Sequence, residues 1–294
     1  MSTDSPAPAD TAARSLAHWS EEGRREMEAF YALARLDYEL LAKALDWSAL
    51  LGRMQSDRSL TLLDVACGSG KFPQALTAYA GLEGVRELRY DLLDPSAFSL
   101  TEAAAALSAP FAEGTHYEST MEDLAPEEGP WDVVWATHAL YALEPAKLDA
   151  AVARYLAARA PGGFSFLAQG ARGGHYIDVY EAFLEGVRGG EGTPYVASDD
   201  LIAAMRDQGA EPEVHRLRYE HVVAAEDTAV LEGFLQRCLF DDTVPLAELL
   251  EAPLVGAYLR GCHDTAAGVY RFHHEVDCVV LSDDEGATPW TAAS

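Results

Sequence analysis

A glycine-rich turn after a short apolar run is the segment of this chain best suited to bind a ligand. Residues 62–70 read Leu-Leu-Asp-Val-Ala-Cys-Gly-Ser-Gly, with Asp64 just before the turn. Gly68 and Gly70 lack the Cβ atoms that would keep a ligand from the backbone, and Pro73 suits the first turn of a following helix. The third glycine of the dinucleotide fingerprint is absent. The turn therefore indicates an adenosine-containing cofactor other than NAD.

Two further polar turns follow this one at the spacing of successive βα units. Asp94 ends a predicted strand at 86–93, about two dozen residues after the glycines, where a carboxylate can bind ribose hydroxyls. The acidic turn at 118–123 follows another predicted strand. This order resembles the class I S-adenosylmethionine-dependent methyltransferases. The resemblance implies S-adenosylmethionine as cofactor, with the glycine turn beside its methionyl part. The expected cofactor residues are Asp64, Gly68, Gly70, Asp94, Ser119, Thr120, Met121 and Thr137, with 119–122 flanking the adenine.

The fourth predicted strand, 131–136, runs into polar and aromatic residues. Open α/β sheets bind ligands at the carboxyl ends of their strands, so His138 and Tyr141 are expected to face the transferable methyl group. A role for His138 in packing or in starting a helix is the alternative.

A closer resemblance, to the histamine N-methyltransferase family, spans about residues 20 to 282. Its landmarks occur in the same order: Leu93-Asp94-Pro95-Ser96, Trp131-Asp132, Leu140-Tyr141, Ser198-Asp199-Asp200-Leu201, Gly233-Phe234-Leu235, Phe240 and Gly268-Val269. The resemblance implies a small aromatic amine held between aromatic side chains, with an acid from the first helices. It places Tyr31, Tyr176, Tyr180 and Phe240 around the substrate.

The same resemblance implies that histidines replace two amide side chains. His138 replaces one, and His273 or His274 replaces the other; successive strand residues point to opposite faces, so at most one of the pair reaches the site. The acid lies among Glu28, Asp37 and Glu39, of which Glu39 is favoured, and a solvated helix face is the alternative for each. Metal-ligand spacing is missing, so no metal is expected.

Methyl transfer is an in-line displacement that depends mainly on holding the nucleophile near the methyl carbon. A weak nucleophile gains from a base whose pKa lies near neutrality, which histidine has. The expected acceptor is therefore a small nitrogen-containing aromatic of the indole or imidazole type, such as a secondary metabolite. It is methylated on a ring carbon or on nitrogen, with His138 as the candidate base, assisted by Glu39 and Tyr141. The alternatives are O-methylation of a small phenol or carboxylate, and a non-catalytic cofactor-binding protein.

Alternating strand and helix patterns predict an α/β fold with a doubly wound, mostly parallel, seven-stranded sheet. Helical periodicity in 21–54 adds a helical preface. The expected organisation is a disordered tail (1–20) and a single methyltransferase domain (21–282), followed by a second tail (283–294). Within the domain the expected parts are a helical substrate cap (21–58), a cofactor-binding half (60–170), a lid insertion (173–197) and a C-terminal substrate half (198–282).

Composition excludes several classes of partner. The net charge of −27, from 48 acids against 21 Lys and Arg, disfavours nucleic acid and anionic membranes. The four cysteines show no C-x-x-C spacing, which favours a reduced, cytoplasmic protein. No apolar run has transmembrane length. The expected partner is a small aromatic amine or heterocycle, with no obligate protein partner.

Overall fold

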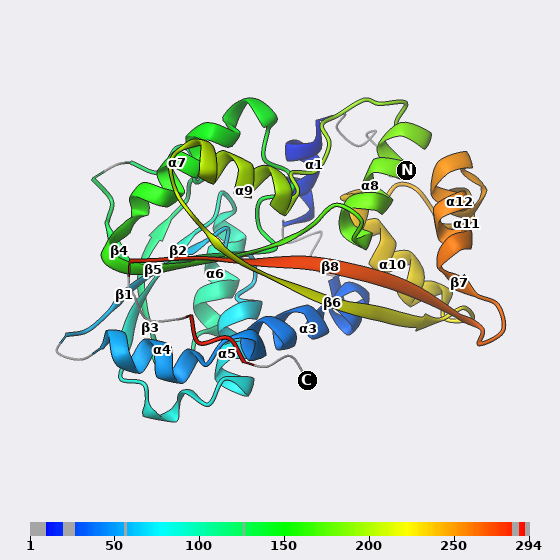
Figure 1. Ribbon diagram of the computed structural model, residues 1–294. Coiled ribbons are helices and arrows are strands. Elements are labelled where there is room, and N and C mark those ends of the chain that lie inside the picture. The colour runs from blue at the N-terminus through cyan, green and yellow to red at the C-terminus, as the bar shows by residue number, and fades with distance from the viewer. Residues whose placement is uncertain (1–9, 20–26, 56–57, 126, 284–287, 292–294) are drawn as a thin grey trace.

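An eight-stranded sheet with helices on both faces forms the core of the computed structural model (Figure 1), which describes residues 10–19, 27–55, 58–125, 127–283 and 288–291. Its strand order is β3-β2-β1-β4-β5-β8-β6, and the two-residue β7 pairs with β8. The pairings from β3 to β5 are parallel, whereas β8 is antiparallel to both β5 and β6. The strands are β1 Thr61–Val65, β2 Leu88–Leu93, β3 Phe111–Tyr117, β4 Trp131–Thr137, β5 Arg159–Gly170, β6 Glu213–Ala224, β7 His263–Asp264 and β8 Val269–Ser282. The predicted α/β fold with a mostly parallel sheet is confirmed.

Most helices connect the strands, as the alternating pattern predicts. They are α1 Thr11–His18, α3 Met27–Ala44, α4 Trp47–Met54, α5 Lys71–Tyr79, α6 Ala97–Ala106, α7 Leu148–Ala158, α8 His175–Gly186, α9 Ser198–Asp207, α10 Thr228–Leu239, α11 Leu246–Glu251 and α12 Pro253–Cys262. Short 3-10 turns lie at Leu82–Gly84 and Pro145–Lys147.

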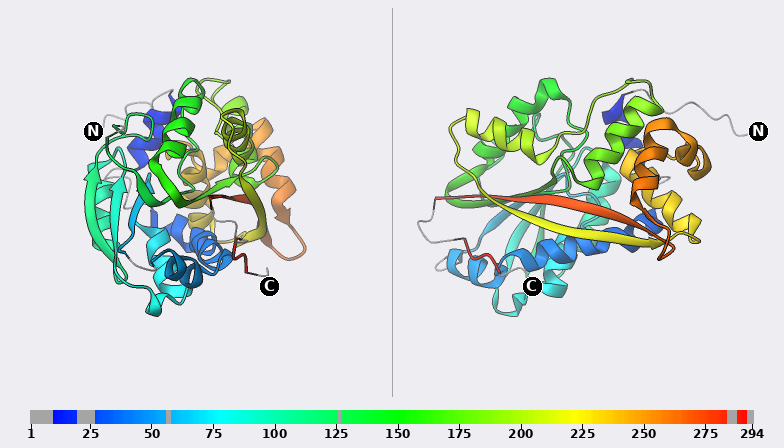
Figure 2. Two further views of the ribbon diagram at one scale, coloured as in Figure 1. Left: turned by 60° about the vertical axis from the view of Figure 1, so that its left-hand side comes forward. Right: turned by 45° about the vertical axis from the view of Figure 1, so that its right-hand side comes forward.

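Helices cover both faces of the sheet (Figure 2), and an apolar layer holds them against each face. On one face, α3 to α6 pack through an aromatic cluster in which the rings of Trp47 and Phe166 lie 5.0 Å apart and those of Phe72 and Trp135 lie 5.1 Å apart. On the other face, α7 and α9 bury Tyr155. Because both faces are covered, the central strands β1 and β4 are mostly apolar.

The antiparallel β6–β8 ribbon extends past the end of β5. β5 stops pairing with β8 at Gly170 opposite Val276, whereas β6 continues to Ala224 opposite Val269. Helices α8, α10, α11 and α12 pack on this extension in a third apolar cluster. The segment expected as a lid, 173–197, therefore contributes a core helix, since Val179, Tyr180 and Phe183 of α8 are fully buried.

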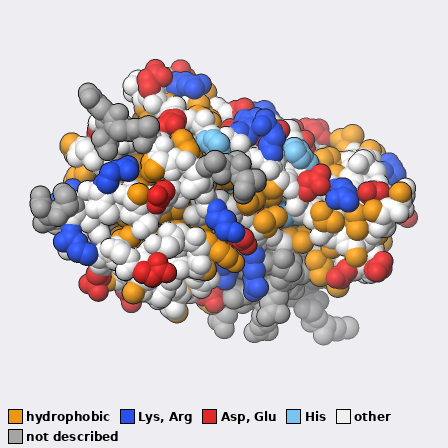
Figure 3. Space-filling view, turned by 60° about the horizontal axis from the view of Figure 1, so that its bottom comes forward, with side chains coloured by type: hydrophobic (Ala, Val, Ile, Leu, Met, Phe, Trp, Pro, Cys, Tyr) orange, Lys and Arg blue, Asp and Glu red, His pale blue; other side chains and the backbone are white. Residues whose placement is uncertain are grey.

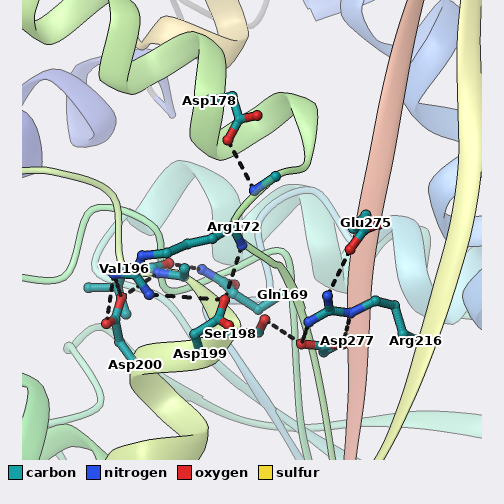
Figure 4. A network of polar contacts seen from close by, with 12 residues as sticks. Gln169, Arg172, Asp178, Val196, Ser198, Asp199, Asp200, Arg216, Glu275 and Asp277 are labelled. Carbon is teal, nitrogen blue, oxygen red and sulfur yellow. Dashed lines mark hydrogen bonds and ion pairs between the residues drawn. The ribbon is translucent and has the colours of Figure 1, made fainter.

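A polar network on one side of β8 fixes the orientation of that strand (Figure 4). The Arg216 guanidinium donates to both carboxylate oxygens of Asp277, at 2.7 and 2.8 Å, and to Glu275 at 2.7 Å. Ser198 at the start of α9 donates to Asp277 at 2.7 Å. Side chains alternate along a strand, so these contacts direct His274 to the opposite side.

The structure differs from the sequence-based expectation at both ends of the chain. Residues 11–18, expected in a disordered tail, form α1, because Asp10 caps the first turn by accepting from the backbone N–H groups of Ala12 and Ala13. Near the other end, Trp290 lies against the fold and donates its indole N–H to Glu213 at 2.5 Å.

The sequence pattern predicts a single helix over 245–260, but the structure divides this segment into α11 and α12. Pro253 begins α12, and Ala252 before it is extended, with φ −60° and ψ 136°. A residue that precedes proline disfavours the helical conformation, which explains the break.

Candidate active site

A cavity of about 410 Å³ lies at the carboxyl ends of the parallel strands. Gly68 borders it after β1, Asp94 after β2, 119–122 after β3 and His138 after β4. Helix α1 forms another wall through Ala12, Ala13, Ser15 and Leu16, and Trp19 follows it. The cavity therefore has the location expected for ligands in an open α/β sheet.

The two glycines of the turn have different roles. Gly68 has a φ of +51° and borders the cavity, and a Cβ there would lie 3.3 Å from the Trp19 ring. Gly70, with a φ of +69°, does not border it; a Cβ there would lie 2.9 Å from that of Ala106 on α6. Gly68 thus admits a ligand to the backbone, whereas Gly70 allows α5 and α6 to pack closely.

Asp94 is a buried carboxyl that faces the cavity. Its oxygens accept from the backbone N–H groups of Gly68 at 3.0 Å and Ser96 at 2.8 Å. Burial raises the pKa of Asp94 to about 6, although these hydrogen bonds act to lower it. The group is therefore mainly ionised at neutral pH. Such a carboxylate fits the hydroxyl groups of a ribose.

Asp64 and Thr137, two of the expected cofactor residues, do not border the cavity. The hydroxyl of Tyr90 donates to Asp64 at 2.7 Å inside the sheet core, and burial raises the pKa of Asp64 to about 7. Ser119, Thr120 and Met121 do line the cavity. Of the expected cofactor residues, five of eight therefore surround one space: Gly68, Asp94, Ser119, Thr120 and Met121.

His138 occupies an unusual backbone position at the end of β4. Its φ is +51°, in the left-handed region that non-glycine residues seldom adopt, and its N–H donates to Ala168 O at 2.8 Å. Its Nδ1 lies 2.8 Å from the Tyr141 hydroxyl. Burial lowers the pKa of His138, and the carboxylate of Asp37 opposes this shift. The structure brings His138 and Tyr141 together at the cavity wall, as the sequence predicts.

Asp37, rather than the favoured Glu39, is the acid of α3 that faces this region. It is 2% exposed, accepts from the Tyr176 hydroxyl at 2.5 Å and lies 2.8 Å from His221 Nε2. Burial would raise the pKa of Asp37, but the neighbouring His221 imidazole outweighs it and holds that pKa well below its usual range. Glu39 instead pairs with Lys43 at 2.5 Å on the outer side of the helix.

The two adjacent histidines of β8 are separated by strand alternation. His274 is buried, its ring lies 4.9 Å from that of Tyr219 and 4.6 Å from that of Tyr176, and burial lowers its pKa to about 3. His273 is half exposed and lies 3.7 Å from Glu275. Only His274 belongs to the buried cluster around Asp37.

The remaining expected substrate residues lie in different places. Phe240 lines the cavity, and Tyr176 packs against His138 with their rings 5.7 Å apart. Tyr180 turns toward α1, where its hydroxyl accepts from Arg14 at 2.6 Å. The side chains of Tyr31 and Glu28 lie outside the described residues.

Sequence reasoning missed helix α1 and His221. Arg14 and Thr11 of α1 are buried against Tyr180, and Arg237 contacts His18 Nδ1 at 2.6 Å. The Asp10 cap was a readable signal for α1, whereas His221 gives no local signal, because only the long-range packing of α3 on β6 brings it to Asp37.

Two further observations concern metal ions and membranes. Among the residues that the structure describes, no group of three or more His, Cys, Asp or Glu side chains is arranged to hold a metal ion. No helix in the described part of the chain is long and apolar enough to cross a membrane.

Comparisons with known proteins agree with this arrangement. The profile of the family described as "Methyltransferase domain" matches residues 62–163. No curated protein matches the sequence. The fold is similar to a protein described as a methyltransferase from Bacillus halodurans C-125, at 16% identity and a TM-score of 0.52, over 80% of this chain and 97% of that one. It is also similar to magnesium protoporphyrin IX methyltransferase from Synechocystis PCC 6803 with bound SAH, at 11% identity and a TM-score of 0.52, over 92% and 99% of the two chains.

Proposed function

Since this chain is an S-adenosylmethionine-dependent methyltransferase of class I, we propose that it methylates a small, nitrogen-containing aromatic molecule. The cofactor supplies a methyl group carried on a sulfonium. In the proposal, Gly68 and Asp94 hold the cofactor's methionyl and ribose parts, and Ser119, Thr120 and Met121 flank its adenine.

The buried carboxylate of Asp37 is the observation that carries the acceptor class. When a neutral nitrogen takes the methyl group, positive charge moves onto the acceptor. An ionised carboxylate in a region of low dielectric stabilises that charge strongly. Asp37 has this character, because it is 2% exposed and keeps its pKa well below the usual range.

Aromatic rings between Asp37 and the cavity support a flat acceptor. The rings of Tyr141 and Tyr176 lie 5.9 Å apart, and that of His138 lies 5.7 Å from Tyr176. Ring faces stack on aromatic molecules and attract cations. These features agree with an imidazole- or indole-type acceptor, and the resemblance to histamine N-methyltransferases implies a small aromatic amine. Methylation at nitrogen or at a ring carbon fits the proposal, and a carbon nucleophile would need a base for its departing proton.

The test is incubation with methyl-labelled S-adenosylmethionine and separate acceptors: histamine, tryptamine, indole, phenol and benzoate. We expect methylated nitrogen aromatics, identified by mass and fragmentation. Asp37→Asn should lower kcat/KM by about 10- to 100-fold, whereas Glu39→Gln, a matched change on the outer side of α3, should have little effect. Methylation of phenol or benzoate alone would instead establish an O-methyltransferase.

A further inference from the structure

Hydrogen bonds around His138 determine which of its ring nitrogens carries the proton. The Tyr141 hydroxyl oxygen accepts from the backbone N–H of Gly170 at 3.0 Å and lies 2.8 Å from His138 Nδ1. In the described part of the chain these are the hydroxyl's two hydrogen-bond partners. A phenolic hydroxyl has a single hydrogen to donate, and an N–H cannot accept it. The Tyr141 O–H therefore points to Nδ1, which accepts.

A neutral His138 must then carry its proton on Nε2. Burial favours the neutral ring by lowering the pKa of His138, and burial also raises the pKa of Tyr141, which keeps its O–H. Nε2 is itself buried and has no hydrogen-bond partner among the described residues. An unsatisfied buried donor is costly, so a ligand atom is the natural partner for this N–H.

The neighbouring backbone keeps this arrangement in place. A Cβ on Gly170 would lie 3.1 Å from the Tyr141 hydroxyl oxygen, a tight contact, so glycine leaves room for the hydroxyl to approach the Gly170 N–H. His138 itself has the left-handed φ of +51°. Strained backbone of this kind persists where many surrounding contacts hold it in place, often at functional sites.

We propose that His138 is a specificity-determining hydrogen-bond donor, which gives its Nε2–H to the acceptor molecule, rather than a general base. This inference rests on the proposed function and deepens it. The atom that receives the hydrogen bond has its lone pair engaged and cannot attack the methyl carbon. The molecule that is methylated therefore carries two different nitrogen atoms. One is a pyridine-type ring nitrogen that accepts the hydrogen bond from His138, and the other is an amine that takes the methyl group. An indole ring offers no in-plane lone pair and lacks the first of these.

The tautomer is tested on the protein without any acceptor. Long-range proton–nitrogen correlation spectra of the 15N-labelled protein distinguish Nε2–H from Nδ1–H, and His138→Gln assigns the signals. We expect the Nε2–H form in the unmodified protein and a mixture of tautomers in Tyr141→Phe. Tyr155→Phe, which removes a buried hydroxyl on the other face of the sheet, should leave the His138 signals unchanged. An Nδ1–H form in the unmodified protein would overturn the proposal.

The donor role is tested with two amines that differ by one ring atom, 3-(aminomethyl)pyridine and benzylamine. We expect kcat/KM to favour the pyridine by roughly tenfold, mostly through KM. His138→Gln retains an N–H donor and should preserve this ratio, whereas His138→Leu should bring it near one. Equal ratios in all three proteins would contradict the donor role, as would a loss of kcat in both variants together with loss of the low-pH limb of the pH profile. If neither amine nor any other nitrogen aromatic is methylated, the proposed function fails, while the spectra still decide the tautomer.

Discussion

Asp64 lies within β1, and Asp94 comes directly after the adjacent parallel strand β2. Only Asp94 borders the cavity. Asp94 receives two backbone N–H groups beside the cavity, and Asp64 receives the Tyr90 hydroxyl within the core. Burial raises the pKa of both, to about 6 and about 7. Both raised pKa values make stability depend on pH, whereas only Asp94 borders the cavity in which we propose that the cofactor binds.

Asp94→Asn should weaken S-adenosylmethionine binding by roughly 10- to 100-fold, since hydrogen bonds to a charged group are the stronger kind. Titration calorimetry at pH 7.5 measures the effect. In the unmodified protein the affinity should also fall as the pH is lowered through about 6, because Asp94 becomes protonated. Asp149→Asn, an exposed acid at the start of α7, is the control. Equal affinity in Asp94→Asn and Asp149→Asn would remove Asp94 from the cofactor site.

Asp64→Asn should change how stability depends on pH. The folded-state pKa of Asp64, about 7, lies above the ordinary aspartate value of 3.8, so the folded state binds the proton more tightly. Its contribution to the free energy of unfolding is therefore present below the unfolded pKa and is lost as the pH rises through about 7. Between pH 5 and pH 8, urea unfolding should show that the unmodified protein loses roughly 2 to 3 kcal/mol from this group, a loss that Asp64→Asn should not show. Parallel pH profiles would contradict this assignment.

At the scale of secondary structure, α1 is the element that closes the cavity. The Tyr180 hydroxyl holds it through Arg14 at 2.6 Å and Thr11 at 2.8 Å, while Leu16 and Trp19 line the cavity. Tyr180→Phe removes both contacts and should weaken cofactor binding by about three- to tenfold. It should also speed trypsin cleavage after Arg14, which is buried. Tyr155→Phe is the matched control. Cleavage and affinity that match the control would show that α1 does not depend on Tyr180.

The strands and helices of the sheet could be predicted because their patterns are local. Apolar runs beside Asp64, Asp94 and His138 predicted the succession of parallel strands along the chain and the edge of the sheet where ligands bind. Helix α1 was missed because it is short and its buried residues are polar, so its burial depends on Tyr180 from a distant segment.

The acceptor side of the site could be predicted only in outline. Asp37 lies three residues after buried Ala34 and four before buried Leu41, so helical periodicity points to it rather than to Glu39. Strand alternation separates His273 from His274 but cannot say which faces inward; the contacts of Arg216 with Asp277 and Glu275 settle that. His221 reaches Asp37 only through packing between distant elements.

Across the whole molecule, a net charge of −27 opposes the compact state by self-repulsion. On the face shown in Figure 3, acidic side chains lie among basic ones, so the repulsion is spread over the surface. Asp37, which we propose to stabilise charge on the methyl acceptor, is by contrast buried and lies beside imidazole and hydroxyl groups. Salt should therefore act mainly on stability, since exposed charges are screened and buried ones much less so.

The melting temperature should rise as sodium chloride is increased from about 0.02 M to about 0.5 M, because screening shortens the reach of surface repulsion to a few ångströms. Differential scanning calorimetry measures the rise, and mannitol at the same osmolarity controls for effects unrelated to charge. Local ion pairs such as those of Arg216 with Glu275 and Asp277 act in the opposite direction, since salt weakens them too. Among the described residues, ion pairs with Lys or Arg involve 13 acids, against 48 in the whole sequence, so repulsion should dominate. A melting temperature that falls with salt would mean that the ion pairs outweigh the net charge.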